Sequence, residues 1–351
     1  MNAKKLCALL LTLVMVLALC ACGAEDTSAS EAPAGNAAEP ATTEEKSFEI
    51  KLAGIKNDED PASIAMQVFA DEVNSNSDTL NVKVYTNSVL GGLNDLLSGM
   101  TNGTVDMMYN TLTSYPWVKG AEAFNVVAAP FLWDDNAELE AFLQAEEAQE
   151  WFESAAQTSG VRCVIAAGEL SPRELTANVP VENAEDFKGL KIRTAESAIV
   201  QETMKKLGAQ PTVIAFADLY MALRQGTVDA QENGWDTVYS SSLYEVQDYF
   251  MATDYIRDVS AIFISNDLWN QLSEEQKAVI TAAAEKAVRT EEATIKEQRD
   301  TILEFLNENM TYVDIDVKSI QDALGEDFYD QFEGDLWPEG TMDIVRNFKA
   351  N

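Results

Sequence analysis

The most constraining feature of this sequence is a short motif that occurs twice. Asp95-Leu96 leads into Gly103-Thr104-Val105-Asp106, and Asp218-Leu219 leads at the same spacing into Gly226-Thr227-Val228-Asp229. Each copy is typical of a helix that ends at a glycine and is followed by a β-strand. The duplication predicts two similar α/β lobes, and such proteins usually bind their ligand in the cleft between the lobes. Chance repetition of a common strand entry is the alternative.

The N-terminus carries an export signal rather than a structural element. Lys4 and Lys5 precede an apolar run from Leu6 to Leu19, which is short for a membrane span but suits a secretory signal. Leu19-Cys20-Ala21-Cys22 resembles a bacterial lipobox, so residues 1–21 are expected to be a lipoprotein signal peptide, with Cys22 as the lipidated first residue. An ordinary signal peptide is the alternative. Residues 22–46 are rich in Ala, Glu, Ser, Thr and Pro and predict a flexible tether. We therefore expect an exported protein, anchored by lipid to the outer face of the cell membrane.

Composition excludes several classes of function. The chain has 24 basic and 59 acidic residues, a formal net charge of −35, so a nucleic-acid partner is not expected. It contains no histidine, which removes Ser–His and Cys–His nucleophilic pairs and imidazole-based zinc sites. Once Cys22 is the lipidated first residue, the only free thiol left is that of Cys163, which we expect to be an inert residue on a buried strand. No cofactor or metal is expected.

The remaining sequence alternates predicted strands and helices. Strands are expected near residues 48–53, 80–84, 105–109, 161–167, 190–193, 212–214, 228–230 and 260–265, and an acidic helix is expected over about 136–158. The boundaries place residues 47–170 and 259–298 in lobe I, and residues 171–258 and 299–351 in lobe II. A helical pattern over about 267–309 would be roughly 60 Å long. Because its middle from Glu291 to Asp300 is nearly all polar, we expect a solvent-exposed helix that spans both lobes.

One group of residues suits a small carboxylate. Ligands of open α/β sheets gather at the carboxyl ends of strands, where Arg193 and Asn233 are expected, with Phe216 before the helix that leads to Asn233. A guanidinium can hold both carboxylate oxygens, the amide adds a hydrogen bond, and the ring packs on the carbon skeleton. An ordinary ion pair between Arg193 and one of the many acidic residues is the alternative.

Several further segments make the sequence resemble the solute-binding proteins of tripartite ATP-independent periplasmic (TRAP) transporters, the DctP family. They are residues 90–91, 130–132, 188–193, 207–212, 215–220, 229–233 and 244–249. These segments follow the family's order and cover residues 46–340. The resemblance implies an α/β, two-lobed, periplasmic-binding-protein-like fold, in which each lobe is a mixed sheet flanked by helices.

The resemblance also implies roles for individual residues. Arg193 falls on the family's arginine that clamps the substrate carboxylate, and Arg173 falls on a second ligand-facing arginine. Phe216 falls on the aromatic that stacks on the ligand, and Asn233 on the asparagine that closes the carboxylate site. An ion pair for Arg173 and a core position for Phe216 remain alternatives.

Some positions depart from the family pattern or are weaker candidates. Gly234, before Trp235 and Asp236, stands where many relatives have proline, and Asn94 stands where many have arginine. Trp235 and Asp236 are candidate ligand-binding residues that favour a hexuronate-like sugar acid. Asp236 could accept hydrogen bonds from sugar hydroxyls or could be a charge at a helix N-terminus. Further candidates for the ligand-cavity wall are Thr111, Ser114, Trp117, Glu169, Lys56 and Asn57.

The resemblance implies a monomeric binding protein, not an enzyme, that captures a small organic acid. It would deliver the acid to the small and large TRAP membrane subunits, of the DctQ and DctM type. A sugar acid such as a hexuronate is favoured, and a C4-dicarboxylate or a sialic acid stays open. A receptor feeding a sensor kinase and a carboxylate-based hydrolase are the alternatives.

Overall fold

The computed structural model describes residues 46–350, and they form two β-sheets with flanking helices. The predicted signal peptide, Cys22 and most of the predicted tether lie outside the described residues. The first sheet has the strand order β2-β1-β3-β10-β4. Its strands are β1 (Phe48–Ala53), β2 (Leu80–Tyr85), β3 (Met107–Thr111), β4 (Val161–Glu169) and β10 (Val259–Ser265). We call this sheet and its helices lobe I.

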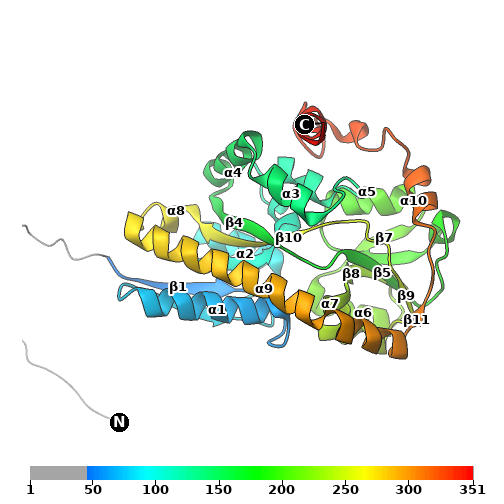
Figure 1. Cartoon of the computed structure of the whole chain (residues 1–351), viewed down its shortest axis with the longest axis horizontal. Helices are drawn as coiled ribbons and strands as arrows, with labels where there is room; N and C mark the ends of the chain where they lie inside the picture. Colours follow the sequence, from blue (N-terminus) through cyan, green and yellow to red (C-terminus); the bar gives the residue numbers. More distant parts are fainter. Residues whose placement is uncertain (1–45, 351) are drawn as a thin grey trace, which may run out of the picture. The chain divides into compact units, whose positions relative to one another are not determined.

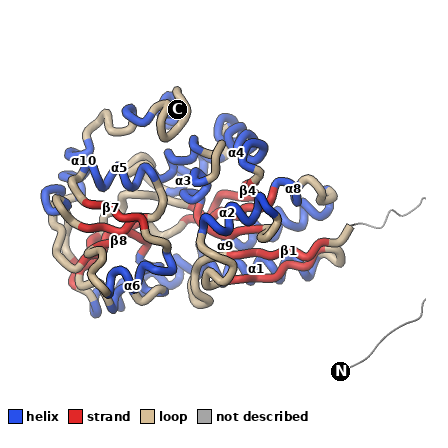
Figure 2. The backbone as a smooth tube through the Cα atoms, turned by 180° about the vertical axis from the view of Figure 1, so that it is seen from behind, coloured by secondary structure: helices blue, strands red, loops and turns tan. Residues whose placement is uncertain are grey.

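The second sheet has the order β11-β9-β5-β8-β6-β7 and forms lobe II. Its strands are β5 (Arg173–Ala177), β6 (Lys191–Thr194), β7 (Gln210–Val213), β8 (Ala230–Gly234), β9 (Tyr249–Met251) and β11 (Thr311–Tyr312). Figure 2 shows the strands of the two sheets as separate groups. The predicted two-lobed α/β fold, with a mixed sheet in each lobe, is confirmed.

The two sheets share one topology, which explains the repeated motif. In lobe I, β2, β1 and β3 are parallel and β10 is antiparallel to β3; in lobe II, β7, β6 and β8 are parallel and β5 is antiparallel to β8. The first motif contains α2 (Leu93–Asn102) and leads into β3, whereas the second contains α6 (Leu219–Arg224) and leads into β8. The two motif glycines have φ of 80° and 68°, a backbone region that favours glycine. The repetition therefore marks the same structural position in each lobe.

Three segments connect the two sheets. Residues 170–172 lead from β4 to β5, and residues 252–258 return from β9 to β10. The third is α9 (Glu274–Asn309), a 36-residue helix that contacts α1 (Pro61–Asn76) and β4 in lobe I and α7 (Trp235–Ser240) in lobe II (Figure 1). At 1.5 Å per residue it is about 54 Å long. The predicted lobe-spanning helix is thus confirmed.

The middle of α9 differs from the prediction. Glu291 is only 5% exposed and Ile295 only 3%, so the polar run expected to face solvent is partly buried. The reason is that α9 packs against both lobes, with contacts to α1 and β4 of lobe I and to α7 of lobe II. Its start also differs, because residues 266–269 form a separate helix, α8 (Asn266–Trp269), before α9 begins with a Ser273–Gln276 capping box.

The other helices cover the outer faces of the sheets. The acidic helix expected over 136–158 is two helices, α3 (Asn136–Leu143) and α4 (Glu146–Ser159), because the first helix ends at Gln144. Lobe II carries α5 (Ala198–Lys206) and α10 (Val317–Leu324), which contact each other.

The sequence predicts that the last helix, α11 (Thr341–Lys349), belongs to lobe II, but the structure places it against lobe I. It returns to α3 of lobe I, where the rings of Phe348 and Phe142 are 5.4 Å apart and Lys349 Nζ is 2.5 Å from a Glu138 carboxylate oxygen. Within residues 46–350, no helix is both long enough and apolar enough to span a bilayer.

Cys163 lies on β4, as predicted, but the residue is only partly buried. Its thiol donates a hydrogen bond of 3.1 Å to the carbonyl of Ile165, and burial of the sulfur raises the pKa of the thiol. A raised pKa keeps the thiol protonated, which fits an unreactive side chain.

Candidate functional site

A cavity lies between the lobes, where the carboxyl ends of the central parallel strands of both sheets meet. Its volume is about 420 Å³, within the usual range for small-molecule sites. Both lobes and α9 contribute to its wall. The polar lining residues are Lys56, Asp60, Ser88, Asn94, Asp95, Tyr109, Asn110, Thr111, Thr113, Ser114, Ser171, Arg173, Arg193, Glu196, Ser197, Glu232, Asn233, Asp236, Thr237, Asp258 and Glu291.

Arg193 is a buried cation in this wall. It lies on β6, where Ile192 packs into the core and Arg193 lines the cavity, and it is only 3% exposed. Its Nε donates a hydrogen bond of 2.9 Å to the carbonyl of Ile214. No carboxylate among residues 46–350 forms an ion pair with Arg193. The alternative interpretation of Arg193, as one half of an ordinary ion pair, is therefore wrong. Burial lowers the pKa of Arg193 from 12.5 to about 10, which marks a charge with incomplete internal compensation.

Arg173 differs from Arg193 because it does have an internal partner. It lines the same cavity from the start of β5, and Nη2 donates to Glu232 Oε1 at 2.9 Å and to the Glu232 carbonyl at 2.7 Å, while Nε contacts the second carboxylate oxygen. The hydroxyl of Tyr255 also donates to Glu232, at 2.7 Å. The ion pair considered as an alternative for Arg173 is therefore present, and most of the cationic charge left for a ligand belongs to Arg193.

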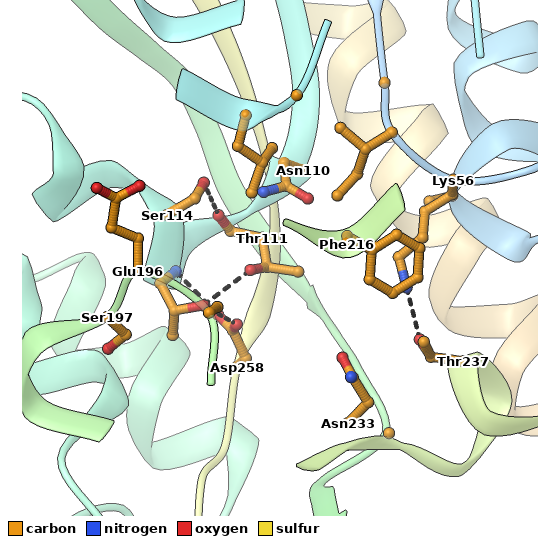
Figure 3. A pocket seen from close by; sticks show the side chains of 18 of the residues that line it. Lys56, Asn110, Thr111, Ser114, Glu196, Ser197, Phe216, Asn233, Thr237 and Asp258 are labelled. Atoms are coloured by element: carbon orange, nitrogen blue, oxygen red, sulfur yellow. Dashed lines mark hydrogen bonds between the residues drawn. The ribbon is translucent and has the colours of Figure 1, made fainter. Parts of the chain in front are cut away.

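Asn233 lies within β8 rather than just beyond the strand. Its Oδ1 accepts a hydrogen bond of 3.2 Å from Arg173 Nη2, and its Nδ2 donates to Gln231 Oε1 at 2.5 Å. Figure 3 shows the amide at the edge of the cavity, below Phe216 and Lys56. The structure thus places Arg193, Arg173 and Asn233 in one cavity wall.

Phe216 and Lys56 meet across the cleft. Lys56 Nζ, from lobe I, lies 4.5 Å from the ring centroid of Phe216 in lobe II (Figure 3). The same ammonium donates a hydrogen bond of 2.7 Å to the hydroxyl of Thr237 and lies 3.7 Å from the carboxylate of Asp60. Phe216 lines the cavity with a partly exposed ring, so it is not simply a core residue.

Asp236 is a buried carboxyl at the first turn of α7. It accepts a hydrogen bond from the hydroxyl of Ser171, and burial together with the nearby charge of Asp60 raises its pKa. A Cβ at Gly234 would lie 2.0 Å from Ser171 Oγ and 2.5 Å from Asp236 Oδ1. A side chain at position 234 would therefore disturb the hydrogen bond between Ser171 and Asp236, and glycine leaves room for it.

Lobe I contributes hydroxyl groups and an amide. The hydroxyls of Thr111 and Thr113 share a hydrogen bond of 2.8 Å, and Thr113 also donates to the buried carboxyl of Asp258 at 2.6 Å. Ser114 donates to the Thr111 carbonyl at 2.7 Å, and Asn110 lies beside these residues (Figure 3). At the edge of the cleft, the side-chain amide of Asn94 donates a hydrogen bond to the carboxylate of Glu196 in lobe II. Asn94, one of the two positions that depart from the family pattern, therefore forms an interlobe contact.

Three predicted residues do not line the cavity: Asn57, Trp235 and Glu169. Asn57 donates a hydrogen bond of 2.7 Å to the carbonyl of Ser240. Trp235 is 4% exposed and packs into a hydrophobic cluster with Leu219 and Val238, because the start of α7 directs the indole toward α6. Glu169 forms an ion pair of 3.0 Å with Lys296 on the outer surface of α9.

Sequence reasoning assigned no role to three buried carboxyls of the cavity, Glu232, Asp258 and Glu291. Glu232 directly precedes Asn233 in the segment 229–233, which resembles the family, so its place beside the ligand site could have been predicted. Asp258 and Glu291 have no local signal, because their burial comes from distant elements that pack around them.

The fold and the cavity together define a two-lobed solute-binding protein. Residues 52–335 match the DctP family, described as bacterial extracellular solute-binding protein, family 7. A solute-binding protein of Roseobacter denitrificans is 28% identical over 276 residues, which is 78% of this chain and 84% of the relative. Its crystal structure, with bound L-galactonate, has a TM-score of 0.78 at 25% identity and covers 87% of this chain and 99% of that chain. The 2,3-diketo-L-gulonate-binding periplasmic protein YiaO of Escherichia coli is 29% identical over 265 residues, or 75% of this chain and 79% of the relative.

The chain therefore belongs to the DctP family of TRAP transporter solute-binding proteins. It is a substrate-binding transport component that works outside the cytoplasm, and the resemblance found in the sequence is confirmed.

Proposed function

We propose that this protein captures a sugar acid, of the hexonate or hexuronate type, in the interlobe cavity and delivers it to the membrane subunits of a TRAP transporter. Arg193 binds the carboxylate, Asn233 and Arg173 complete that end of the site, and Phe216 packs against the carbon skeleton. Thr111, Lys56 and Asp236 contact the remainder of the ligand.

The observation that carries this proposal is the state of Arg193. A guanidinium that is 3% exposed, with no carboxylate partner among the described residues, lines a cavity of about 420 Å³. A buried charge without a partner is costly, and an anionic ligand would compensate it with a charge-assisted hydrogen bond.

The rest of the cavity supports a hydroxylated acid with a single carboxylate. Glu232 already neutralises Arg173, and Lys56 lies 3.7 Å from the carboxylate of Asp60, so a second ligand carboxylate would find little free positive charge. The other polar groups are mainly hydroxyls, amides and carboxyls, which suit a chain of hydroxyl groups. The Roseobacter relative binds L-galactonate, and the relative from E. coli is named for 2,3-diketo-L-gulonate, which are both acids of this kind.

Ligand would bridge the two lobes and favour their closed arrangement. Asn57 donates a hydrogen bond of 2.7 Å to the carbonyl of Ser240, and Ser240 donates to Asp60 at 2.8 Å, so the lobes already touch at one side of the cavity. A ligand held by Arg193 in lobe II and by the hydroxyl groups of lobe I would stabilise this closed form by its extra contacts there.

Attachment to the membrane is part of the proposal. Lipid on Cys22 and a tether to residue 46 would hold a monomeric binding protein near the transporter. Replacing Cys22 with alanine should move the protein from the membrane fraction to the soluble exported fraction. Retention of the Cys22→Ala protein in washed membranes would contradict lipid anchoring.

A thermal-shift screen tests the choice of ligand. The panel contains L-galactonate, D-galacturonate, L-gulonate, succinate and a sialic acid. A ligand at about 100 times its dissociation constant stabilises the folded protein by about 2.7 kcal/mol, which gives a clear rise in melting temperature. We expect the hexonates and hexuronates to give the largest shifts. A larger shift with succinate or sialic acid would refute the sugar-acid assignment, and no shift with any acid would refute the proposed function.

A further inference from the structure

Helices as well as strands line the cavity, and one of these helices is α9. Glu291, near the middle of α9, lines the cavity although the helix belongs to both lobes. Its side chain is held in place by two hydroxyl groups that donate to the same oxygen, Oε2. Tyr109 of β3 donates at 2.7 Å and Ser260 of β10 donates at 2.5 Å.

The second carboxyl oxygen of Glu291 is not engaged in this way. No hydrogen bond to Oε1 occurs within residues 46–350, although the residue is only 5% exposed. Because Glu291 lines the cavity, this oxygen is available to accept a hydrogen bond from a group bound there, and a carboxyl oxygen normally has such a partner.

We propose that Glu291 is a ligand-binding residue that accepts a hydrogen bond from a hydroxyl group of the bound acid, at a distance from the carboxylate held by Arg193. This inference rests on the proposed function, since it assigns a hydroxyl-bearing ligand to the same cavity. It also gives α9 a direct contact with the ligand, so that the helix spanning both lobes senses occupancy.

The proposal has a consequence for protons. Burial, with smaller contributions from the charges of Asp60 and Asp236, raises the pKa of Glu291, and the hydroxyls of Ser260 and Tyr109 lower it, so that the pKa is about 7. Lys56, beside Asp60, is the cation of this part of the cavity. A ligand hydroxyl that donates to Glu291 favours the carboxylate form, so binding should lower this pKa and release protons at pH values near 7. A ligand that accepted a hydrogen bond from the protonated carboxyl would cause proton uptake instead.

Isothermal titration calorimetry with L-galactonate tests this directly. The binding enthalpy is measured at pH 7 in two buffers of different ionisation enthalpy, which yields the number of protons released. The test variant is Glu291→Gln, which has nearly the same shape but cannot titrate. The matched control is Glu292→Gln, the neighbouring carboxyl on the outer side of α9, where it bonds Arg289 and Lys296. If another acid of the panel binds wild-type protein more tightly, it replaces L-galactonate.

We expect wild-type and Glu292→Gln protein to release protons on binding, and Glu291→Gln protein to release none and to bind about tenfold more weakly. Glu291→Gln protein that keeps the wild-type affinity and proton release would overturn the inference, as would proton uptake by wild-type protein. Failure of every acid to bind wild-type protein would instead remove the proposed function itself. Proton release that is lost equally in Glu292→Gln protein would also count against a specific role for Glu291.

Discussion

Replacing Arg193 with methionine separates the role of its charge in binding from its role in the fold. Methionine keeps an apolar stem of similar length and removes the guanidinium. Truncating one partner of a buried, hydrogen-bonded charge pair costs about 2–5 kcal/mol of binding free energy. We therefore expect the affinity for the tightest-binding acid to fall by about 30-fold to several thousandfold.

The structure also predicts that this substitution does not destabilise the ligand-free protein. Burial lowers the pKa of Arg193 from 12.5 to about 10. That shift corresponds to a penalty for the buried charge on the order of 3 kcal/mol. Only one hydrogen bond, to the carbonyl of Ile214, is lost in return. The melting temperature of ligand-free Arg193→Met protein should therefore equal or exceed that of the wild type.

Calorimetric titration and thermal denaturation of the same samples measure both effects. Arg193→Lys keeps a charge but lacks the planar fork, so its affinity should lie between those of wild-type and Arg193→Met protein. Arg162→Met is the control, because Arg162 pairs with Glu153 on the outside of lobe I, with N–O distances of 2.9 and 3.1 Å. Wild-type affinity in Arg193→Met protein would refute our assignment of the carboxylate site. A large fall in melting temperature, with unchanged affinity, would show that Arg193 is a structural residue.

Three further predictions concern the fold around the cavity. Glu232→Gln leaves the guanidinium of Arg173 without its buried partner, and should lower the free energy of unfolding by about 3–5 kcal/mol, measured by urea denaturation. Burial raises the pKa of Glu174 to about 8, whereas a glutamate of the unfolded chain titrates near pH ~4.3. The stability that this proton provides is therefore lost as the pH rises through about 8. As the pH rises, the melting temperature of Glu174→Gln protein should increase relative to that of the wild type. A difference between the two melting temperatures that does not change with pH would contradict this. Lys56→Met removes the interlobe contacts to Thr237 and to the Phe216 ring. The lobes of the ligand-free protein should then move apart, and small-angle X-ray scattering should give a larger radius of gyration. An unchanged radius would show that these contacts do not hold the lobes together.

The topology could be predicted because its signals are local. A glycine with positive φ after a helix, followed by a strand, is encoded within a dozen residues, and the two copies of the repeated motif, at Gly103 and Gly226, lie at the same place in the two sheets. The same holds for Asp60, whose side chain accepts from the Ala62 amide at the start of α1. The position of Arg193 near the carboxyl end of β6 was also predictable, since Leu190 and Ile192 alternate there with Lys191 and Arg193.

The polar network of the cavity could not be predicted, because burial there depends on residues far apart in the sequence. Glu291 is separated from Tyr109 by most of the chain, yet the two side chains share a hydrogen bond of 2.7 Å. In a polar stretch of helix, the sequence pattern does not distinguish one buried glutamate from its exposed neighbours. The return of α11 to lobe I has the same origin, since its contact between Phe348 and Phe142 joins distant segments.

Comparison of the two lobes predicts a defined orientation for the bound acid. In the register of the parallel strands, Ile192 pairs with Ala230 in lobe II as Leu52 pairs with Met107 in lobe I, so Arg193 occupies the position that Ala53 holds in lobe I. The duplicated scaffold thus presents equivalent strand ends to the cleft, but only lobe II carries a buried guanidinium there. An acid should therefore bind to lobe II through its carboxylate first, because that contact does not require closure. The hydroxyl and amide groups of lobe I, and the carboxyl of α9, then contact the remainder of the ligand only when the lobes close.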